Sequence, residues 1–241
     1  MKDALLLTVG EFLVLHAGAL HECSIKGYTE LVTGGMAGPI TDMQSKFLST
    51  VRSNVDRMNT IVSDLSDLNK IEAGMLKIEF KPTSIPEVIE EAVRSTRRQI
   101  EEKEQVVDVN VPDSLPDVWA DRNRMIQIAV NLVSNATKYT PNGGNVIVGA
   151  EKTTHPADTG EEIPVVHLWV KDTGIGISPE DQAKIFQQYF RTEMSKTQAS
   201  GTGLGLNITK NLVEMQGGKI WFESELDRGT TFHVNIPLAE N

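Results

Sequence analysis

An unbroken apolar repeat runs between residues 48 and 69 of this 241-residue chain. Side chains recur there in alternating steps of three and four, at Leu48, Val51, Val55, Met58, Val62, Leu65 and Asn69. This spacing predicts a long helix that packs along one seam, as in a coiled coil, with polar residues on its other faces. A single seam cannot bury itself, so this helix requires partner helices.

The segment before this helix supplies one such partner. Ile25, Tyr28 and Val32 repeat the same spacing, and a glycine- and proline-rich break at residues 34–39 separates the two segments. The pattern predicts an antiparallel helical hairpin, roughly residues 4–33 and 41–73, which Gly74 closes as a C-cap. Two helices make a thin core, so we expect hairpins to associate as a dimeric four-helix bundle. The alternative is a hairpin that packs on its own second domain.

The remainder of the chain predicts one α/β sandwich. Strands are expected at residues 76–80, 107–111, 146–150, 165–170, 220–225 and 230–236. Helices are expected at residues 85–104, 122–139 (capped by Asp121) and 203–216, and a polar loop at residues 153–162. The predicted fold class is α+β, with a hairpin domain at residues 1–74 and a two-layer α/β sandwich at residues 75–241.

Composition argues against several classes of protein. The formal net charge of −10 disfavours a nucleic-acid-binding protein, which needs a basic face. Cys23 is the only cysteine, so an intrachain disulfide and a four-cysteine metal site are excluded, and a cytoplasmic location fits. Glu11, His16 and two glycines interrupt the apolar stretch from Ala4 to Leu20, which therefore predicts neither a membrane span nor a signal peptide.

Two amides and a lysine stand out on the predicted helix at residues 122–139. Asn131 and Asn135 are four residues apart, so both amides project from one helix face. An amide oxygen is a hard neutral ligand that suits Mg²⁺, and Lys138 adds a positive charge for phosphate. Taken alone, the motif is equally compatible with polar decoration of a helix surface.

Two glycine-containing motifs follow. Asp172 comes directly after a predicted strand, and its carboxylate can accept a hydrogen bond from the exocyclic amine of adenine, while Gly174 and Gly176 permit close approach to a flat base. Residues 201–206 open a predicted helix, where exposed backbone amides can hold phosphate. The polar stretch between them, from Phe186 to residue 200, predicts either a mobile lid over the nucleotide or a plain surface loop.

In this order the motifs resemble the N, G1, F and G2 boxes of sensor histidine kinases, within the gyrase, Hsp90, kinase and MutL superfamily. The resemblance implies ATP binding with Mg²⁺, and Asn135 as the metal ligand. The nucleotide-binding residues that it implies are Asn131, Asn135, Lys138, Tyr139, Asp172, Gly174, Gly176, Ile177, Phe190, Arg191, Gly201, Thr202, Gly203, Leu204, Gly205 and Leu206. The ATPases of the superfamily carry a glutamate where this chain has Asn131, which cannot act as a base, so phosphoryl transfer is favoured over hydrolysis.

The resemblance also implies a phosphoacceptor histidine on the first helix of the hairpin. Counting back from Ser24 places His16 at that position, facing outward, whereas His21 is the second choice because it falls on the buried seam with Ile25. The acid and the proline that follow the family's histidine are missing after His16. A degenerate kinase that dimerises and binds ATP with little autophosphorylation is therefore the alternative function.

The implied activity extends beyond this chain. The ATP γ-phosphoryl group would pass to the chain's own histidine and then to an aspartate in the receiver domain of a response regulator. We expect a homodimer formed through the hairpin, no membrane segment within this chain and a cytoplasmic location. An upstream sensory domain or partner is also expected, so the chain is either a fragment of a longer receptor or a partner-regulated cytoplasmic kinase.

Overall fold

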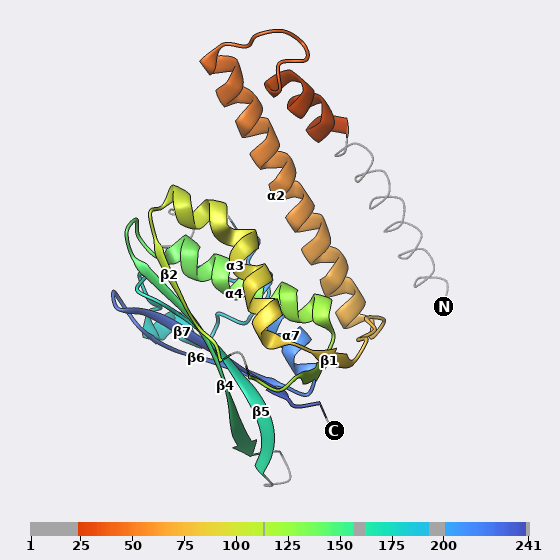
Figure 1. Cartoon of the computed structure of the whole chain (residues 1–241), viewed down its shortest axis with the longest axis vertical. Helices are drawn as coiled ribbons and strands as arrows, with labels where there is room; N and C mark the ends of the chain where they lie inside the picture. Colours follow the sequence, from red (N-terminus) through yellow and green to blue (C-terminus); the bar gives the residue numbers. More distant parts are fainter. Residues whose placement is uncertain (1–23, 113, 157–161, 193–200, 240–241) are drawn as a thin grey trace. The chain divides into compact units, whose positions relative to one another are not determined.

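The computed structural model describes residues 24–112, 114–156, 162–192 and 201–239. The chain divides into two compact units, Met1–Met75 and Leu76–Asn241. Figure 1 shows that the described part of the first unit is helical and that the second unit contains the sheet. Within the described residues, no helix is both long enough and apolar enough to cross a membrane.

Two antiparallel helices form the described part of the first unit. Residues 24–33 make one helix, and α2 (Asp42–Glu72) makes the other. Two ion pairs cross between them: Lys26 Nζ lies 2.6 Å from Asp56 Oδ1, and Arg52 lies 3.4 Å from Glu30. The predicted hairpin is confirmed over these residues, whereas its predicted beginning, residues 4–23, lies outside the described part of the chain.

Local hydrogen bonds explain where α2 begins and ends. Thr41 and Gln44 form a reciprocal capping box, in which Gln44 N donates to Thr41 Oγ1 at 3.2 Å and Thr41 N donates to Gln44 Oε1 at 2.8 Å. At the other end, Gly74 adopts a φ of 64° and Met75 N donates to Lys70 O, as in a Schellman motif. Gly74 therefore ends the helix, as the sequence predicted.

The apolar seam of α2 is only partly buried within one chain. Val55 is 5% exposed, whereas Val51, Met58 and Leu65 are 41%, 59% and 43% exposed. Apolar side chains that recur at helical spacing and remain this exposed indicate a surface that packs against a further partner.

The second unit is built on a five-stranded sheet. Its strands lie in the order β2 (Val106–Asn110), β4 (Asn145–Pro156), β5 (Glu162–Asp172), β7 (Gly229–Pro237) and β6 (Lys219–Glu225). β2 and β4 pair in parallel, and the other neighbours are antiparallel. A two-stranded antiparallel sheet joins β1 (Lys81–Thr83) to β3 (Val118–Ala120).

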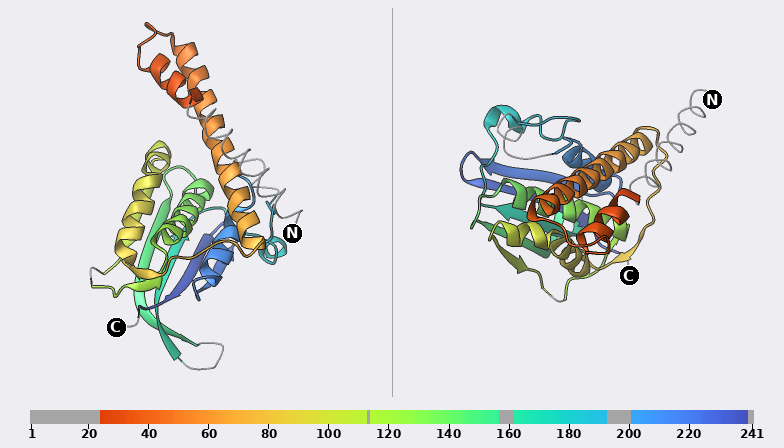
Figure 2. Two further views of the ribbon diagram at one scale, coloured as in Figure 1. Left: turned by 90° about the vertical axis from the view of Figure 1, so that its right-hand side faces the viewer. Right: turned by 90° about the horizontal axis from the view of Figure 1, so that it is seen from above.

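Three helices, α3 (Ile85–Glu102), α4 (Arg122–Tyr139) and α7 (Gly205–Glu214), cover one face of this sheet (Figure 2). The single-turn helix α5 (Pro179–Gln182) precedes α7. Each long helix buries residues three or four apart, which is the pattern of an amphipathic helix on a core. The largest fully buried side chains between the layers include Ile85, Ile89, Met125, Ile128, Leu132, Leu168, Leu212 and Ile236. The predicted two-layer α/β sandwich is confirmed.

Two stretches differ from the prediction. Residues 76–80 were expected to form a strand but have no regular structure, because the partner strand β3 pairs only with Lys81–Thr83. Residues 153–162 were expected to be a polar loop, yet β4 continues to Pro156 and β5 begins at Glu162. An antiparallel ribbon that faces water on one side accepts polar side chains, so polarity alone gave the wrong assignment there.

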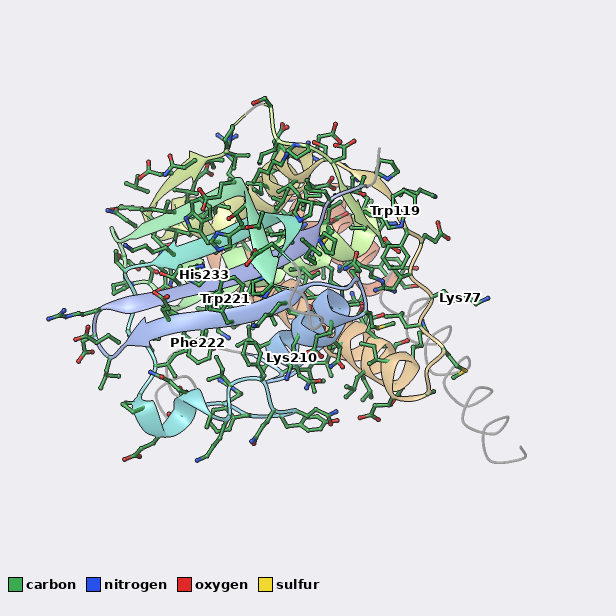
Figure 3. The ribbon with its side chains drawn as sticks, turned by 90° about the horizontal axis from the view of Figure 1, so that it is seen from below. Lys77, Trp119, Lys210, Trp221, Phe222 and His233 are labelled. Atoms are coloured by element: carbon green, nitrogen blue, oxygen red, sulfur yellow. The ribbon has the colours of Figure 1, made fainter. Side chains whose placement is uncertain are left out.

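Histidine and tryptophan side chains gather on the sheet face opposite the helices. Trp221 of β6 and His233 of β7 lie side by side (Figure 3), with ring centroids 5.0 Å apart. His167 Nε2 lies 2.9 Å from His233 Nδ1, and Trp169 lies flat on Gly149, where a Cβ would collide with its ring. Burial lowers the pKa of His233, the charge of His167 lowers it further, and Glu223 opposes both effects.

Candidate functional site

The amide pair on α4 is held in a fixed orientation. Asp121 caps this helix, since its Oδ1 accepts hydrogen bonds from the Asn123 and Arg124 amides at 3.0 and 3.2 Å. Further along, Asn131 Nδ2 donates to Thr209 Oγ1 of α7 at 2.7 Å. Both predicted site residues on this face are therefore oriented by the packing of α4 against α7.

Asn135 has the free oxygen that a metal ligand needs. Its Nδ2 donates to Asn131 Oδ1 at 3.3 Å, which fixes the amide plane. No donor among the described residues reaches Asn135 Oδ1, and this atom is not buried. The described residues contain no group of three His, Cys, Asp or Glu side chains that could hold a metal. A hard neutral oxygen of this kind fits a Mg²⁺ ion whose remaining ligands are phosphate oxygens and water.

The glycine-rich segment before α7 lies against α4. A Cβ on Gly205 would stand 2.6 Å from Asn131 Oδ1, and one on Gly201 would stand 2.7 Å from Lys138 Nζ. Thr202 Oγ1 accepts a hydrogen bond from Leu204 N at 3.1 Å, which orders the turn into the helix. The structure thus brings the Lys138 ammonium beside the segment that opens α7, and this combination of charge and helix N-terminus suits an anion.

Asp172 is a buried carboxylate with one oxygen already used. Its Oδ1 accepts hydrogen bonds from Gly174 N at 2.8 Å and from Thr230 N at 3.2 Å. Within the described part of the chain, no donor reaches its Oδ2. Burial raises the pKa of Asp172 to about 6, and the two backbone hydrogen bonds oppose this rise. At neutral pH the free oxygen is therefore an ionised acceptor at the end of β5.

The loop that follows Asp172 is fastened to the β6–β7 hairpin. Asp227 N donates to Ile175 O at 2.8 Å, and Ile177 N donates to Ser224 Oγ at 2.9 Å. Gly176 has a φ of 66°, and a Cβ there would collide with the Glu225 carbonyl oxygen. Only glycine fits this conformation and this close approach.

Sequence reasoning missed the contribution of this hairpin. Thr230 and Ser224 belong to strands that read as ordinary alternating sequence, and the contacting donor of Thr230 is a backbone amide. The pattern of side chains in a sequence does not indicate which backbone amide will donate to a site residue. The one signal available was the turn Asp227-Arg228-Gly229, which marks a tight hairpin without indicating what it contacts.

The remaining predicted residues are distributed around the same region. Tyr139 lies under Lys138 Nζ, 4.8 Å from its ring centroid. Asn207 Nδ2 of α7 donates to Phe186 O at 2.9 Å, which attaches the stretch containing Phe190 and Arg191 to that helix. The rest of the predicted lid, residues 193–200, lies outside the described residues, as do both candidate acceptors, His16 and His21.

These features define a nucleotide-binding α/β sandwich preceded by a helical hairpin. Residues 120–240 match the model of the histidine kinase-, DNA gyrase B- and HSP90-like ATPase family, and residues 23–74 match the His Kinase A (phospho-acceptor) domain. The chain belongs to this family as the catalytic core of a sensor histidine kinase. The hairpin match begins at Cys23, so it includes neither His16 nor His21.

Two curated relatives come from Caulobacter vibrioides. The Non-motile and phage-resistance protein is 36% identical over 221 residues, which cover 90% of this chain and 25% of that protein. Histidine protein kinase DivJ is 32% identical over 215 residues, which cover 89% of this chain and 34% of that protein. The chain thus spans about a quarter to a third of the length of these relatives.

Solved structures show the same architecture. Full-length ShkA in complex with AMPPNP matches with a TM-score of 0.70 and 24% identity, covering 95% of this chain and 46% of that one. The catalytic domain of histidine kinase ThkA matches with a TM-score of 0.55 and 30% identity, covering 66% of this chain and 96% of that one. The ShkA likeness concerns the fold alone.

Proposed function

We propose that this chain is an ATP-dependent protein-histidine kinase core. The γ-phosphoryl group of ATP would pass to His16 of the hairpin and then to an aspartate of a response-regulator receiver domain. In the first step the bond from the γ-phosphorus to the bridging oxygen of ADP would break, a phosphorus–nitrogen bond would form, and the imidazole would release its proton to water. His21 is the second choice for the acceptor.

One observation carries the preference for transfer over hydrolysis. Both ends of the Asn131 amide are occupied, by Thr209 and by Asn135, and an amide has no basic lone pair for activating water. A site that binds ATP beside such a residue holds the phosphoryl group for another nucleophile. The match of residues 23–74 to the His Kinase A (phospho-acceptor) domain supports a histidine as this nucleophile.

The other residues would hold the nucleotide. Asp172 Oδ2 would accept a hydrogen bond from the exocyclic amine of adenine. Lys138 and the backbone amides at the start of α7 would contact the phosphates. Mg²⁺, held by Asn135 Oδ1 and phosphate oxygens, would neutralise charge on the phosphates. The residues of this chain orient the nucleotide, and the buried position of Asp172 favours adenine over guanine, which has a carbonyl at that place.

We also propose that the chain acts as a homodimer through the hairpin. The exposed seam residues Val51, Met58 and Leu65 support this assembly, since a second hairpin would cover them in a four-helix bundle. An upstream sensory domain or partner is part of the proposal, because the chain spans only part of the length of its relatives. A cytoplasmic location and a response-regulator partner complete it and rest on membership of the sensor histidine kinase family.

A second candidate is a degenerate kinase that dimerises and binds ATP but transfers little phosphate. The match to the phosphoacceptor domain starts after His16 and His21, and His16 lacks the adjacent acid of the family. An adjacent general base contributes about 10²–10⁴-fold in rate, so its loss favours this alternative.

Incubation with γ-labelled ATP and Mg²⁺ separates the two candidates. The wild-type chain, His16→Gln and His21→Gln are compared, and the label is tested for the acid lability and base stability of a phosphohistidine. Label that is lost only in His16→Gln supports the kinase with His16 as acceptor, whereas label lost only in His21→Gln moves the acceptor to His21. An unlabelled wild-type protein that still binds ATP supports the degenerate kinase, and steady ATP turnover without phosphoprotein would contradict both.

A further inference from the structure

The last turn of α4 ends in backbone carbonyls that the helix itself leaves without donors. Lys103 Nζ donates hydrogen bonds to three of them, the carbonyl oxygens of Thr137, Lys138 and Thr140, at 2.9, 2.7 and 2.9 Å. Gln105 Nε2 donates to Thr137 O at 3.0 Å and to Thr140 O at 2.8 Å. A positive charge at this place also complements the negative end of the helix dipole.

A strained turn delivers both side chains to the same place. Between Lys103 and Gln105, Glu104 adopts a φ of 53°, in the left-handed region that a residue with a Cβ rarely occupies. Gln105 N donates to Ile100 O at 3.1 Å, which closes the end of α3, and Gly143 N donates back to Lys103 O at 2.9 Å. Backbone strain of this kind persists where surrounding contacts fix it, and it is frequent beside functional sites.

The turn that Lys103 holds carries both halves of the nucleotide site. Lys138 extends from it toward Gly201 on the phosphate side. On the base side, Tyr139 O accepts a hydrogen bond from Ile175 N at 3.3 Å, in the loop that begins at Asp172. Movement of this one turn would therefore displace the phosphate-binding ammonium and the adenine-binding loop together.

We infer that Lys103, supported by Gln105, is a positioning residue for nucleotide binding, which acts through the C-terminal turn of α4 without touching the nucleotide. This inference rests on the proposed function, because it concerns the same ATP site. Burial, followed by the charge of Lys138, lowers the pKa of Lys103, as expected for an ammonium held against backbone rather than in water.

The test measures the dissociation constant of ATP with Mg²⁺ by calorimetry on the full chain, at a temperature where circular dichroism shows every variant folded. Lys103→Met removes the N–H donors of the ammonium group and keeps an unbranched apolar side chain. Lys103→Arg keeps a positive charge and N–H donors. Lys152→Met is the matched control, because Lys152 is exposed on β4. We expect about a tenfold weaker affinity for Lys103→Met, in the range found for residues that act through a neighbour. Lys103→Arg recovers most of the loss, and Lys152→Met binds like the wild type.

The comparison separates positioning from stability. If Lys103→Met lowers only the melting temperature and binds ATP within twofold of the wild type, the inference is overturned. Should Lys103→Met not fold, Gln105→Leu provides the same comparison, with a smaller loss of about threefold expected and an unchanged affinity overturning the inference. A wild-type chain that binds no ATP refutes the proposed function, and the inference falls with it.

Discussion

Replacing Asp172 by asparagine exchanges one oxygen of a buried carboxylate for an NH₂ group and leaves the shape of the side chain unchanged. In the wild type, Gly174 N and Thr230 N donate to Asp172 Oδ1 at 2.8 and 3.2 Å. The amide oxygen of asparagine can keep both hydrogen bonds. The NH₂ group then occupies the position of Oδ2, where the proposed adenine amine also donates. Two donors face each other, so the hydrogen bond to the base is lost.

The size of this loss follows from the kind of bond. A hydrogen bond to a charged group contributes roughly 1.5–3 kcal/mol, which corresponds to an affinity for ATP that is about 10- to 150-fold weaker. Folding should change little at pH 7. Removing an ionised carboxylate whose pKa burial raises to about 6 stabilises the folded state, while the new NH₂ group lacks a partner and costs about 1–3 kcal/mol. The two effects oppose each other.

Calorimetric titration with ATP and Mg²⁺ at pH 7.5 measures the affinity, and urea denaturation measures the free energy of unfolding. Asp108→Asn, an exposed position on β2, controls for the loss of one negative charge. In the wild type, affinity should also fall as the pH drops below about 6, because protonation removes the ionised acceptor, and the variant should lack this dependence. An Asp172→Asn protein that binds ATP within twofold of the wild type would refute the assignment of Asp172 to adenine.

Three further substitutions test the structural argument. Glu104→Gly should raise the free energy of unfolding by about 0.5–1 kcal/mol in urea melts, because glycine adopts the left-handed φ of 53° without strain, and a decrease would contradict this reasoning. Burial lowers the pKa of His233, so the unfolded chain binds the proton more readily and the melting temperature of the wild type should fall as the pH drops below about 6.5. His233→Asn should reduce this fall, and an equal dependence of the melting temperature on pH in both proteins would contradict the argument. Thr41→Ala should destabilise the hairpin by about 1 kcal/mol through loss of the capping box, as measured by circular dichroism, and an unchanged melt would show that the cap contributes nothing.

Periodicity predicted most of the fold because the core lies on one side of each element. The buried side chains of α3 recur at Ile85, Val88, Ile89, Ala92, Thr96 and Ile100, which is the spacing that apolar residues show in the sequence. β3 was not predicted, since the three residues Val118–Ala120 are too short to show alternation. The prediction of a strand at residues 76–80 was wrong, because an alternating sequence cannot show whether a partner strand lies beside it.

The sequence could predict those parts of the candidate site that consist of side chains with distinctive chemistry. Asp172, Asn131 and Asn135 stand out because their chemistry is unusual at helix and strand positions. In the structure Asn135 donates to Asn131 on α4, and the loop that follows Asp172 contacts the end of the same helix through Ile175 N and Tyr139 O. The supporting groups were not predictable. Lys103 resembles any surface lysine until the fold brings it to carbonyls 34 to 37 residues later in the chain.

The fastening of the Asp172 loop to the β6–β7 hairpin also bears on the order of events during synthesis. The second donor to Asp172 comes from Thr230, 58 residues later in the chain. A nascent chain that has emerged only as far as α7 already contains all four motifs, yet the loop lacks its contacts with Ser224, Asp227 and Thr230. If Asp172 binds adenine as proposed, this recognition would therefore mature only when the last two strands have paired. A truncation within β7 would remove nucleotide binding while leaving every recognisable motif in place.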